Sequence, residues 1–206
     1  MQNEAVSKAF WEGSTFYPNY PFIKERRKYE IDYLLKHLPA NAESLLDLGC
    51  GNGSTTILLR ELTYIKKYWC YDIGAGMLAT IGGNRDSELL TQVWDANSGD
   101  FIFPEVDVTI CMNMFPCIFN DAVVEEIVKN IQSSVFITRI TCEKERLEIN
   151  KFSEDLGHHF AACYRTVEEY TNIIHKYFSG VEITRAFPDE IESAYGSKQY
   201  FFLCKR

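Results

Sequence analysis

The sequence lacks several features that would assign it to a specialised class of protein. No apolar run approaches the ~20 residues needed to cross a bilayer. The N-terminus MQNEAVSKAFW has neither the basic start nor the apolar core of a signal peptide. The seven cysteines are odd in number and contain no C-x-x-C pair, so neither a disulfide framework nor a metal site is predicted. We therefore expect a cytoplasmic protein with reduced, mostly buried thiols and no membrane association.

Positive charge is also scarce, since 21 lysines and arginines face 29 aspartates and glutamates and leave a net charge of −8. A large nucleic-acid footprint normally needs a basic face, so we do not expect nucleic acid as a partner. A hydrophobic fraction of 46% and a length of 206 residues are typical of one globular domain with a substantial core. No repeat or linker divides the chain, and residues 1–206 are predicted to form a single domain.

The most informative stretch is LLDLGCGNGSTT, residues 45–56. Its leucines predict a short buried strand, and Gly49, Gly51 and Gly53 predict a tight turn before a helix. The glycine spacing is G-x-G-x-G, whereas the dinucleotide fingerprint is G-x-G-x-x-G. Asp47 would repel a pyrophosphate but can hold an ammonium group, directly or through water. The segment therefore disfavours an NAD site and favours a ligand with an amino-acid moiety.

Residues 47–53, DLGCGNG, resemble motif I of the class I S-adenosylmethionine-dependent methyltransferases. Nineteen residues after the last glycine, Asp72 ends a second strand, where its carboxylate can accept both ribose hydroxyls of a nucleoside. The segment DIGAGML that begins there is similar to the family's D-x-S-x-x-M-L, with Gly74 in place of the usual small residue or serine. The resemblance covers residues 45–205 and implies S-adenosyl-L-methionine (SAM) as the cofactor.

The same resemblance implies roles for residues along the strand ends. Ile73 would pack on the adenine with Met77 nearby, although Met77 also fits a core position. Asp95 would accept the adenine amino group, although a polar strand end would have the same sequence. The predicted cofactor-binding residues are Tyr17, Tyr20, Arg27, Asp47, Gly49, Cys50, Gly51, Gly53, Asp72, Ile73, Met77, Asp95, Ala96 and Asn113.

The rest of the pattern alternates strands and helices, which is typical of a doubly wound α/β fold. Strands are predicted at about 45–48, 67–72, 89–94, 106–112, 134–140, 181–187 and 199–203, and helices at about 22–38, 55–64, 121–131 and 167–178. Thr166 and Glu169 form a capping box for the last helix. By the resemblance, the fold is a Rossmann-like seven-stranded, mainly parallel sheet with one antiparallel strand and helices on both faces.

Two segments stand outside this alternation, and the first is N-terminal. Residues 9–22 are rich in aromatic residues and contain two prolines, so we expect loops and turns there rather than regular structure. Residues 1–40 are predicted to form a lid and a helix over SAM, in which Tyr17 and Tyr20 border the methyl-transfer site and Arg27 faces the cofactor carboxylate. The alternatives are aromatic residues that complete the core and an arginine that pairs with a glutamate or reaches solvent.

The second segment, residues 141–166, contains a charged run and two adjacent histidines. In the family that the chain resembles, an insertion at this point stands over the active site. His158 and His159 are therefore the candidate catalytic bases, because a histidine can take a proton from a methyl acceptor. The alternative is that both histidines are exposed and have no catalytic role.

The predicted function is transfer of a methyl group from SAM to an O or N atom of a small molecule. The acidic charge and the aromatic N-terminal segment favour a small-molecule acceptor. After the fourth strand, residues 113–116 read NMFP rather than the NPPY associated with methylation of adenine or glutamine amino groups. Methylation of a protein or RNA and a non-catalytic SAM-binding subunit are the alternatives, and a homodimer is left open.

Overall fold

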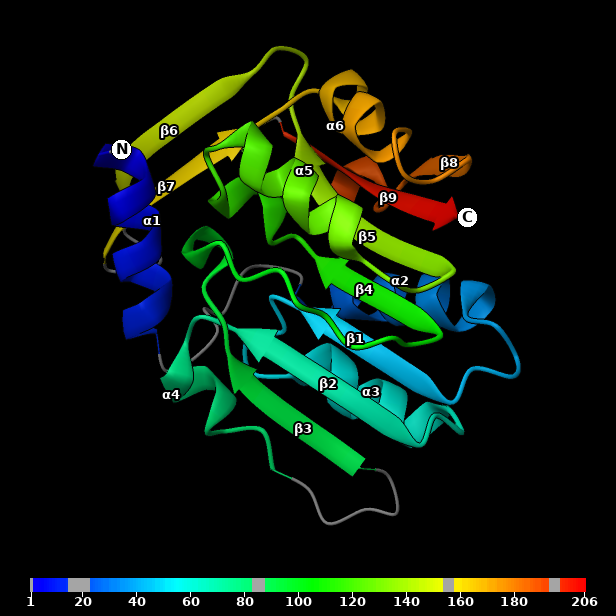
Figure 1. Cartoon of the computed structure of the whole chain (residues 1–206). Helices are drawn as coiled ribbons and strands as arrows, with labels where there is room; N and C mark the ends of the chain where they lie inside the picture. The colour runs from blue at the N-terminus through cyan, green and yellow to red at the C-terminus, as the bar shows by residue number, and fades with distance from the viewer. Residues whose placement is uncertain (1, 15–22, 83–87, 154–157, 193–196) are drawn as a thin grey trace.

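The computed structural model describes residues 2–14, 23–82, 88–153, 158–192 and 197–206. Its main sheet has the strand order β3-β2-β1-β4-β5-β9-β8 (Figure 1). The strands are β1 (Ser44–Leu48), β2 (Lys67–Asp72), β3 (Glu88–Val93), β4 (Val108–Met112), β5 (Val135–Cys142), β8 (Gly180–Arg185) and β9 (Lys198–Lys205). Strand β9 is antiparallel to both β5 and β8, whereas β3, β2, β1, β4 and β5 pair in parallel. The predicted seven-stranded, mainly parallel sheet is confirmed.

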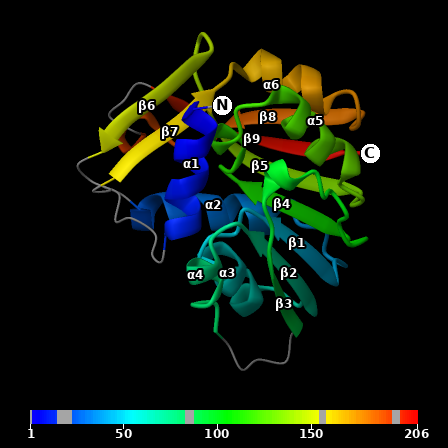
Figure 2. The same ribbon diagram turned by 60° about the vertical axis from the view of Figure 1, so that its left-hand side comes forward.

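Helices cover both faces of this sheet (Figures 1 and 2). On one face, α2 (Ile23–His37) and α3 (Ser54–Leu62) bury Leu34 and Leu59 against Leu45 of β1. On the other face, α5 (Asp121–Asn130) and α6 (Val167–Ile174) belong to the core that contains Leu46. Successive residues of β1 thus enter opposite cores, which is why the central strands are apolar throughout. The predicted capping box of Thr166 and Glu169 is present at the start of α6.

Residues 9–13 correct one expectation, because they belong to a helix and not to a loop. Helix α1 spans Gln2–Gly13, and the aromatic segment that continues through residues 15–22 lies outside the described part of the chain. The two prolines of the segment come after Gly13 in the sequence, so neither interrupts the helix. The rings of Phe10 and Trp11 meet Phe160 edge to face, at centroid distances of 5.8 and 6.5 Å. Tertiary packing of these rings holds the helix, and a local reading of aromatic content does not reveal it.

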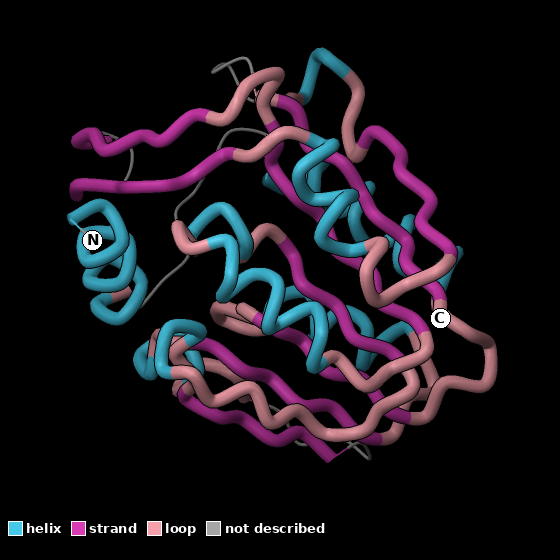
Figure 3. Tube along the Cα trace, turned by 45° about the horizontal axis from the view of Figure 1, so that its top comes forward, coloured by secondary structure: helices cyan, strands magenta, loops and turns pink. Residues whose placement is uncertain are grey.

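The segment 141–166 contains a hairpin that the sequence pattern did not reveal. Strands β6 (Leu147–Ser153) and β7 (His158–Tyr164) form a separate antiparallel two-stranded sheet, with Leu147 opposite Tyr164. The hairpin extends past the carboxyl edge of the main sheet and lies beside α1 (Figures 1 and 3). Strand β6 is largely exposed, since Ile149 is half-buried while Leu147 and Phe152 are 46% and 54% exposed.

The remaining elements are short and connect the strand ends. They are α4 (Ala75–Leu78), η1 (Ala96–Ser98), η2 (Phe115–Cys117) and η3 (Asp189–Ile191). All seven cysteines are free, and five of them are buried, as expected for structural thiols. Within the described ranges, the helices are too short or too polar to cross a bilayer.

Candidate functional site

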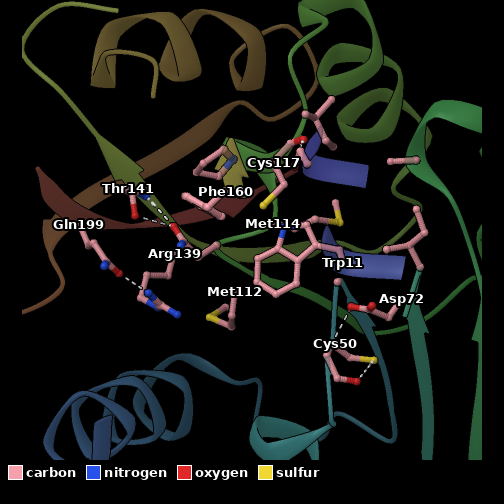
Figure 4. Close-up of a pocket in the computed structure, with 18 of the residues that line it drawn as sticks. Trp11, Cys50, Asp72, Met112, Met114, Cys117, Arg139, Thr141, Phe160 and Gln199 are labelled. Atoms are coloured by element: carbon pink, nitrogen blue, oxygen red, sulfur yellow. Dashed lines mark hydrogen bonds between the residues drawn. The ribbon is translucent and has the colours of Figure 1, made fainter. Parts of the chain in front are cut away.

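A cavity of about 430 Å³ lies where the strands β1, β2, β4 and β5 end, and α1 and the β6–β7 hairpin form its outer wall (Figure 4). Residues far apart in the sequence meet there, because the carboxyl ends of parallel strands share one edge of the sheet. The predicted residues that line it are Arg27, Asp47, Gly49, Cys50, Gly51, Asp72, Ile73, Met77, Asp95, Ala96 and Asn113. Tyr17 and Tyr20 lie outside the described residues.

The glycine turn between β1 and α3 depends on backbone conformations that side chains disfavour. The φ angles of Gly49, Gly51 and Gly53 are 70°, 57° and 68°, all in the left-handed region. A Cβ atom on Gly49 would lie 2.7 Å from the Cβ of Met114. The amide of Gly49 donates to the carbonyl of Tyr71 over 2.8 Å, so the turn is fixed to β2. Gly53 begins α3 and is absent from the cavity wall.

Asp72 joins the glycine turn to the next turn through both oxygens of its carboxylate. One oxygen accepts the amide of Gly51 over 2.8 Å and the other accepts the amide of Gly74 over 2.8 Å. Burial raises the pKa of Asp72, while these backbone amides act against that rise. Each carboxylate oxygen has a second acceptor site. Asp72 can therefore bind ligand hydroxyls at the cavity while it holds the turn.

Asp47 is buried more deeply than Asp72, with 1% of its surface exposed against 7%. Its carboxylate accepts a hydrogen bond from the hydroxyl of Thr56 over 2.6 Å. Burial raises the pKa of Asp47 to about 7. Near neutral pH a substantial fraction of this carboxyl is therefore protonated, and a cationic ligand group in the cavity would favour its charged form.

Arg27 points toward the glycine turn and pairs with a glutamate, which was one of the two alternatives for it. Its Nη1 donates to the hydroxyl of Thr55 over 2.6 Å and lies 3.6 Å from the carboxylate of Glu30. Glu30 is 4% exposed and also accepts the Nε of Arg139 over 2.9 Å. Burial alone would raise the pKa of Glu30, but the charges of Arg139 and Arg27 outweigh it and hold that pKa below its ordinary value.

Sequence reasoning missed Glu30 and Arg139, although a signal was present for each. Glu30 directly precedes the buried Ile31 on the packed side of α2, and Arg139 interrupts the otherwise apolar β5. A charge in a buried run needs a partner, so each residue predicts another charge across the fold. The pairing itself could not be read from the sequence, because 109 positions separate the two residues.

Asp95 contacts α1 as well as the cavity. One carboxylate oxygen accepts the amide of Asn97 over 2.9 Å and so caps η1. The other oxygen lies 2.7 Å from the Nζ of Lys8, and this hydrogen bond raises the pKa of Lys8. Met77 is fully buried, as expected for a residue of the core. It also contributes to the cavity wall.

Asn113 follows β4 and adopts a φ of 69°, which asparagine tolerates better than most residues. Its side-chain oxygen accepts the amide and the hydroxyl of Thr141 over 2.9 and 2.7 Å. The loop after β4 is thereby fixed to the end of β5. Asn113 and the following Met114 both line the cavity.

His158 and His159, the candidate catalytic bases, do not line the cavity. Both are exposed on β7, where the ring of His158 lies 6.3 Å from that of Phe10 and the ring of His159 lies 5.7 Å from that of Phe152. All four histidines fall in the described part of the chain, and none of them lines the cavity. From β7, Phe160 and Tyr164 line the cavity, whereas His158 lies at the start of the strand against Phe10.

Comparison with known proteins agrees with this geometry. Residues 45–135, less than half of the chain, match the family model of a methyltransferase domain. A malonyl-[acyl-carrier protein] O-methyltransferase from Brevibacillus brevis is 22% identical over 108 residues, which make up 51% of this chain and 39% of that protein. The chain thus matches about two fifths of the length of this curated relative.

Solved structures share the fold over almost the whole chain. Geranyl diphosphate C-methyltransferase from Streptomyces coelicolor has a TM-score of 0.67 and 10% identity, over 100% of this chain and 98% of that one. Magnesium protoporphyrin IX methyltransferase from Synechocystis has a TM-score of 0.66 and 12% identity, over 100% and 98% of the two chains. The chain thus has the fold of S-adenosylmethionine-dependent methyltransferases, and its glycine turn beside Asp72 falls within the residues that match a methyltransferase domain.

Proposed function

We propose that this protein transfers the methyl group of SAM to an O or N atom of a small molecule. The observation that carries the proposal is the placement of Asp72. Its buried carboxylate fixes the glycine turn through the Gly51 amide and faces the same cavity as that turn. Such a carboxylate can accept the two ribose hydroxyls of a nucleoside.

The residues present fit the parts of SAM. The left-handed Gly49 and Gly51 leave the turn without side chains where the amino-acid part would approach. Asp47, with its pKa of about 7, becomes fully charged when an ammonium group arrives. Asp95 lies on the same wall as Asp72, at the place predicted for the adenine amino group.

SAM supplies a sulfonium methyl group that is already activated toward nucleophiles. An acceptor lone pair would form the bond to the methyl carbon while the carbon–sulfur bond broke and left its electron pair on sulfur, and a proton on the acceptor atom would pass to solvent. The protein therefore needs chiefly to align donor and acceptor and to exclude water. Trp11, Met112, Met114 and Phe160 form an apolar middle section of the cavity that serves this purpose (Figure 4).

A small acceptor is supported by the cover over the cavity. Helix α1 and the β6–β7 hairpin lie across the mouth, where a protein or RNA substrate would have to enter. The names of two similar proteins, a malonyl-[acyl-carrier protein] O-methyltransferase and a geranyl diphosphate C-methyltransferase, include an acyl group carried on a protein and a small isoprenoid. By its name the first of them transfers to oxygen, as proposed here, whereas the second transfers to carbon.

The test is transfer of a radiolabelled methyl group from SAM in a cell extract that is afterwards separated into small molecules, protein and RNA. We expect label in the small-molecule fraction, and a loss of most of this label with Asp72→Ala. Label in protein or RNA would contradict the small-molecule acceptor. SAM binding without any transfer would favour a non-catalytic SAM-binding subunit.

A further inference from the structure

The cavity has two ends of different character (Figure 4). Asp72 and Cys50 mark one end, while Arg139, Thr141 and Gln199 mark the other, with the apolar section between them. Met112 of β4 pairs with Arg139 of β5, so Arg139 stands two strands away from the glycine turn of β1. At about 4.8 Å per strand, the two backbones are roughly 10 Å apart.

The end of the cavity that carries Arg139 has a positive balance of charge. Arg26 and Arg139 each lie 5.7 Å from the ring of Phe187 and line the wall with Glu30, which leaves a net charge of +1, while Arg27 lies at the glycine turn. Two further lining residues, Lys151 and Glu143, cancel each other. Outside the cavity, the carboxylate of Glu192 is already paired with Arg185 and Lys198.

Arg139 is held in place but is not saturated with hydrogen bonds. Its Nε donates to Glu30 over 2.9 Å, its Nη1 donates to the side-chain oxygen of Gln199, and its guanidinium lies 5.7 Å from the ring centroid of Phe187. No described residue accepts a hydrogen bond from its Nη2 or from the Nε2 of Gln199. Only 14% of the Arg139 side chain is exposed.

Two N–H donors of a fixed, mostly buried pair thus remain for a ligand. Because Gln199 uses its oxygen on Arg139, its amide nitrogen is held next to the guanidinium. A planar carboxylate can accept one bond from each group, and Arg is the residue that best matches such a fork. Glu30 positions Arg139 through Nε and does not occupy its Nη2.

We infer that the methyl acceptor is a small carboxylic acid, whose carboxylate binds Arg139 and Gln199 while its reacting atom lies toward the glycine turn. The inference rests on the proposed function, since it assigns the acceptor class of that same cavity.

The test compares matched acids and amides on the protein saturated with S-adenosylhomocysteine. The probes are benzoate with benzamide and hexanoate with hexanamide, and their dissociation constants are measured by ligand-observed NMR. We expect each acid to bind at least about tenfold more tightly than its amide, as a charge-assisted pair would provide. Equal affinities, or no binding of either acid, would overturn the inference.

Two variants test whether the preference for acids over amides comes from Arg139 and Gln199. Gln199→Glu keeps an oxygen for Arg139 but removes the N–H donor and adds a negative charge, so the preference for acids should disappear. Lys151→Gln removes a cation from the opposite wall and should preserve that preference. If Lys151→Gln abolishes the preference and Gln199→Glu does not, the carboxylate lies on the hairpin wall and the assignment is wrong.

Binding of S-adenosylhomocysteine in the same samples separates this inference from the proposed function. If that ligand binds and the acids show no preference, the acceptor class alone is wrong. If it does not bind the wild-type protein, the proposed function fails first.

Discussion

Lowering the pH from 7 to 5.5 should weaken the binding of S-adenosylhomocysteine, because Asp47 must lose a proton before it can hold the ligand's ammonium group. The carboxyl is 1% exposed and its pKa lies at about 7. About half of the molecules therefore carry the charge at pH 7, and only about 3% carry it at pH 5.5. The α-amino group of the ligand stays mostly protonated over this range.

The expected change follows from the ratio of these charged fractions. Affinity should fall about fifteenfold between pH 7 and pH 5.5, and binding at pH 7 should release about half a proton. Titration calorimetry at both pH values measures the affinity. Repeating it in two buffers of different ionisation enthalpy measures the proton release.

The matched control is Asp47→Asn, which keeps the bond from Thr56 and cannot ionise. It should bind more weakly than the wild type at pH 7 and show little dependence on pH. Asp72 is present in both proteins, so its own titration cancels in the comparison. An affinity ratio between wild type and Asp47→Asn that is the same at both pH values would refute the role of Asp47.

Three further outcomes test the site. Asp72→Ala should weaken SAM binding about 30- to 1000-fold, the equivalent of 2 to 4 kcal/mol for lost charged hydrogen bonds, and unchanged affinity in a folded variant would contradict the ribose assignment. Because the folded state raises the pKa of Asp47 from 3.8 to about 7, its contribution to stability is present below pH 3.8 and is lost as the pH rises through about 7. The free energy of unfolding of Asp47→Asn, measured with urea, should therefore rise relative to that of the wild type between pH 3.8 and about 7, by at most about 4 kcal/mol. A difference between the two proteins that stays constant over this range would argue against the raised pKa of Asp47. Gly49→Ala should lower the free energy of unfolding by about 1–3 kcal/mol, because its Cβ would meet Met114, whereas Gly82→Ala has open space and should change it by less than about 0.5 kcal/mol.

The ends of β1 and β2 could be predicted from the sequence because their signals are local. The glycines, Asp47 and Asp72 lie within 26 consecutive residues, and each follows a short apolar strand. A motif of this kind fixes both its own conformation and its neighbours. The alternation of strands and helices then determined the sheet, including the antiparallel β9 through the family resemblance.

The cover of the cavity could not be predicted in the same way. Helix α1 and strands β6 and β7 pack mainly on each other, through contacts such as that of Phe10 with Phe160. Helix α1 finds its partner in β7, about 150 residues away, while β6 pairs with β7 itself. A pattern of local hydrophobicity is weak in elements with a single buried face, and adjacent histidines there attract attention without reaching the site.

The end of the cavity that carries Arg139 could be predicted only in part from the sequence. Glu30, Arg139 and Gln199 come from α2, β5 and β9, and each is an isolated polar residue in a largely apolar element. The sequence marks them as residues that need partners. Only the fold shows that they are partners of one another.

The structure of the protein with bound SAM or S-adenosylhomocysteine tests the central claim most directly. We predict that both ribose hydroxyl oxygens lie about 2.5–3.0 Å from the carboxylate oxygens of Asp72, with the amino-acid part of the ligand against Gly49 and Gly51. A ribose that makes no contact with Asp72, or a ligand bound outside this cavity, would contradict the account.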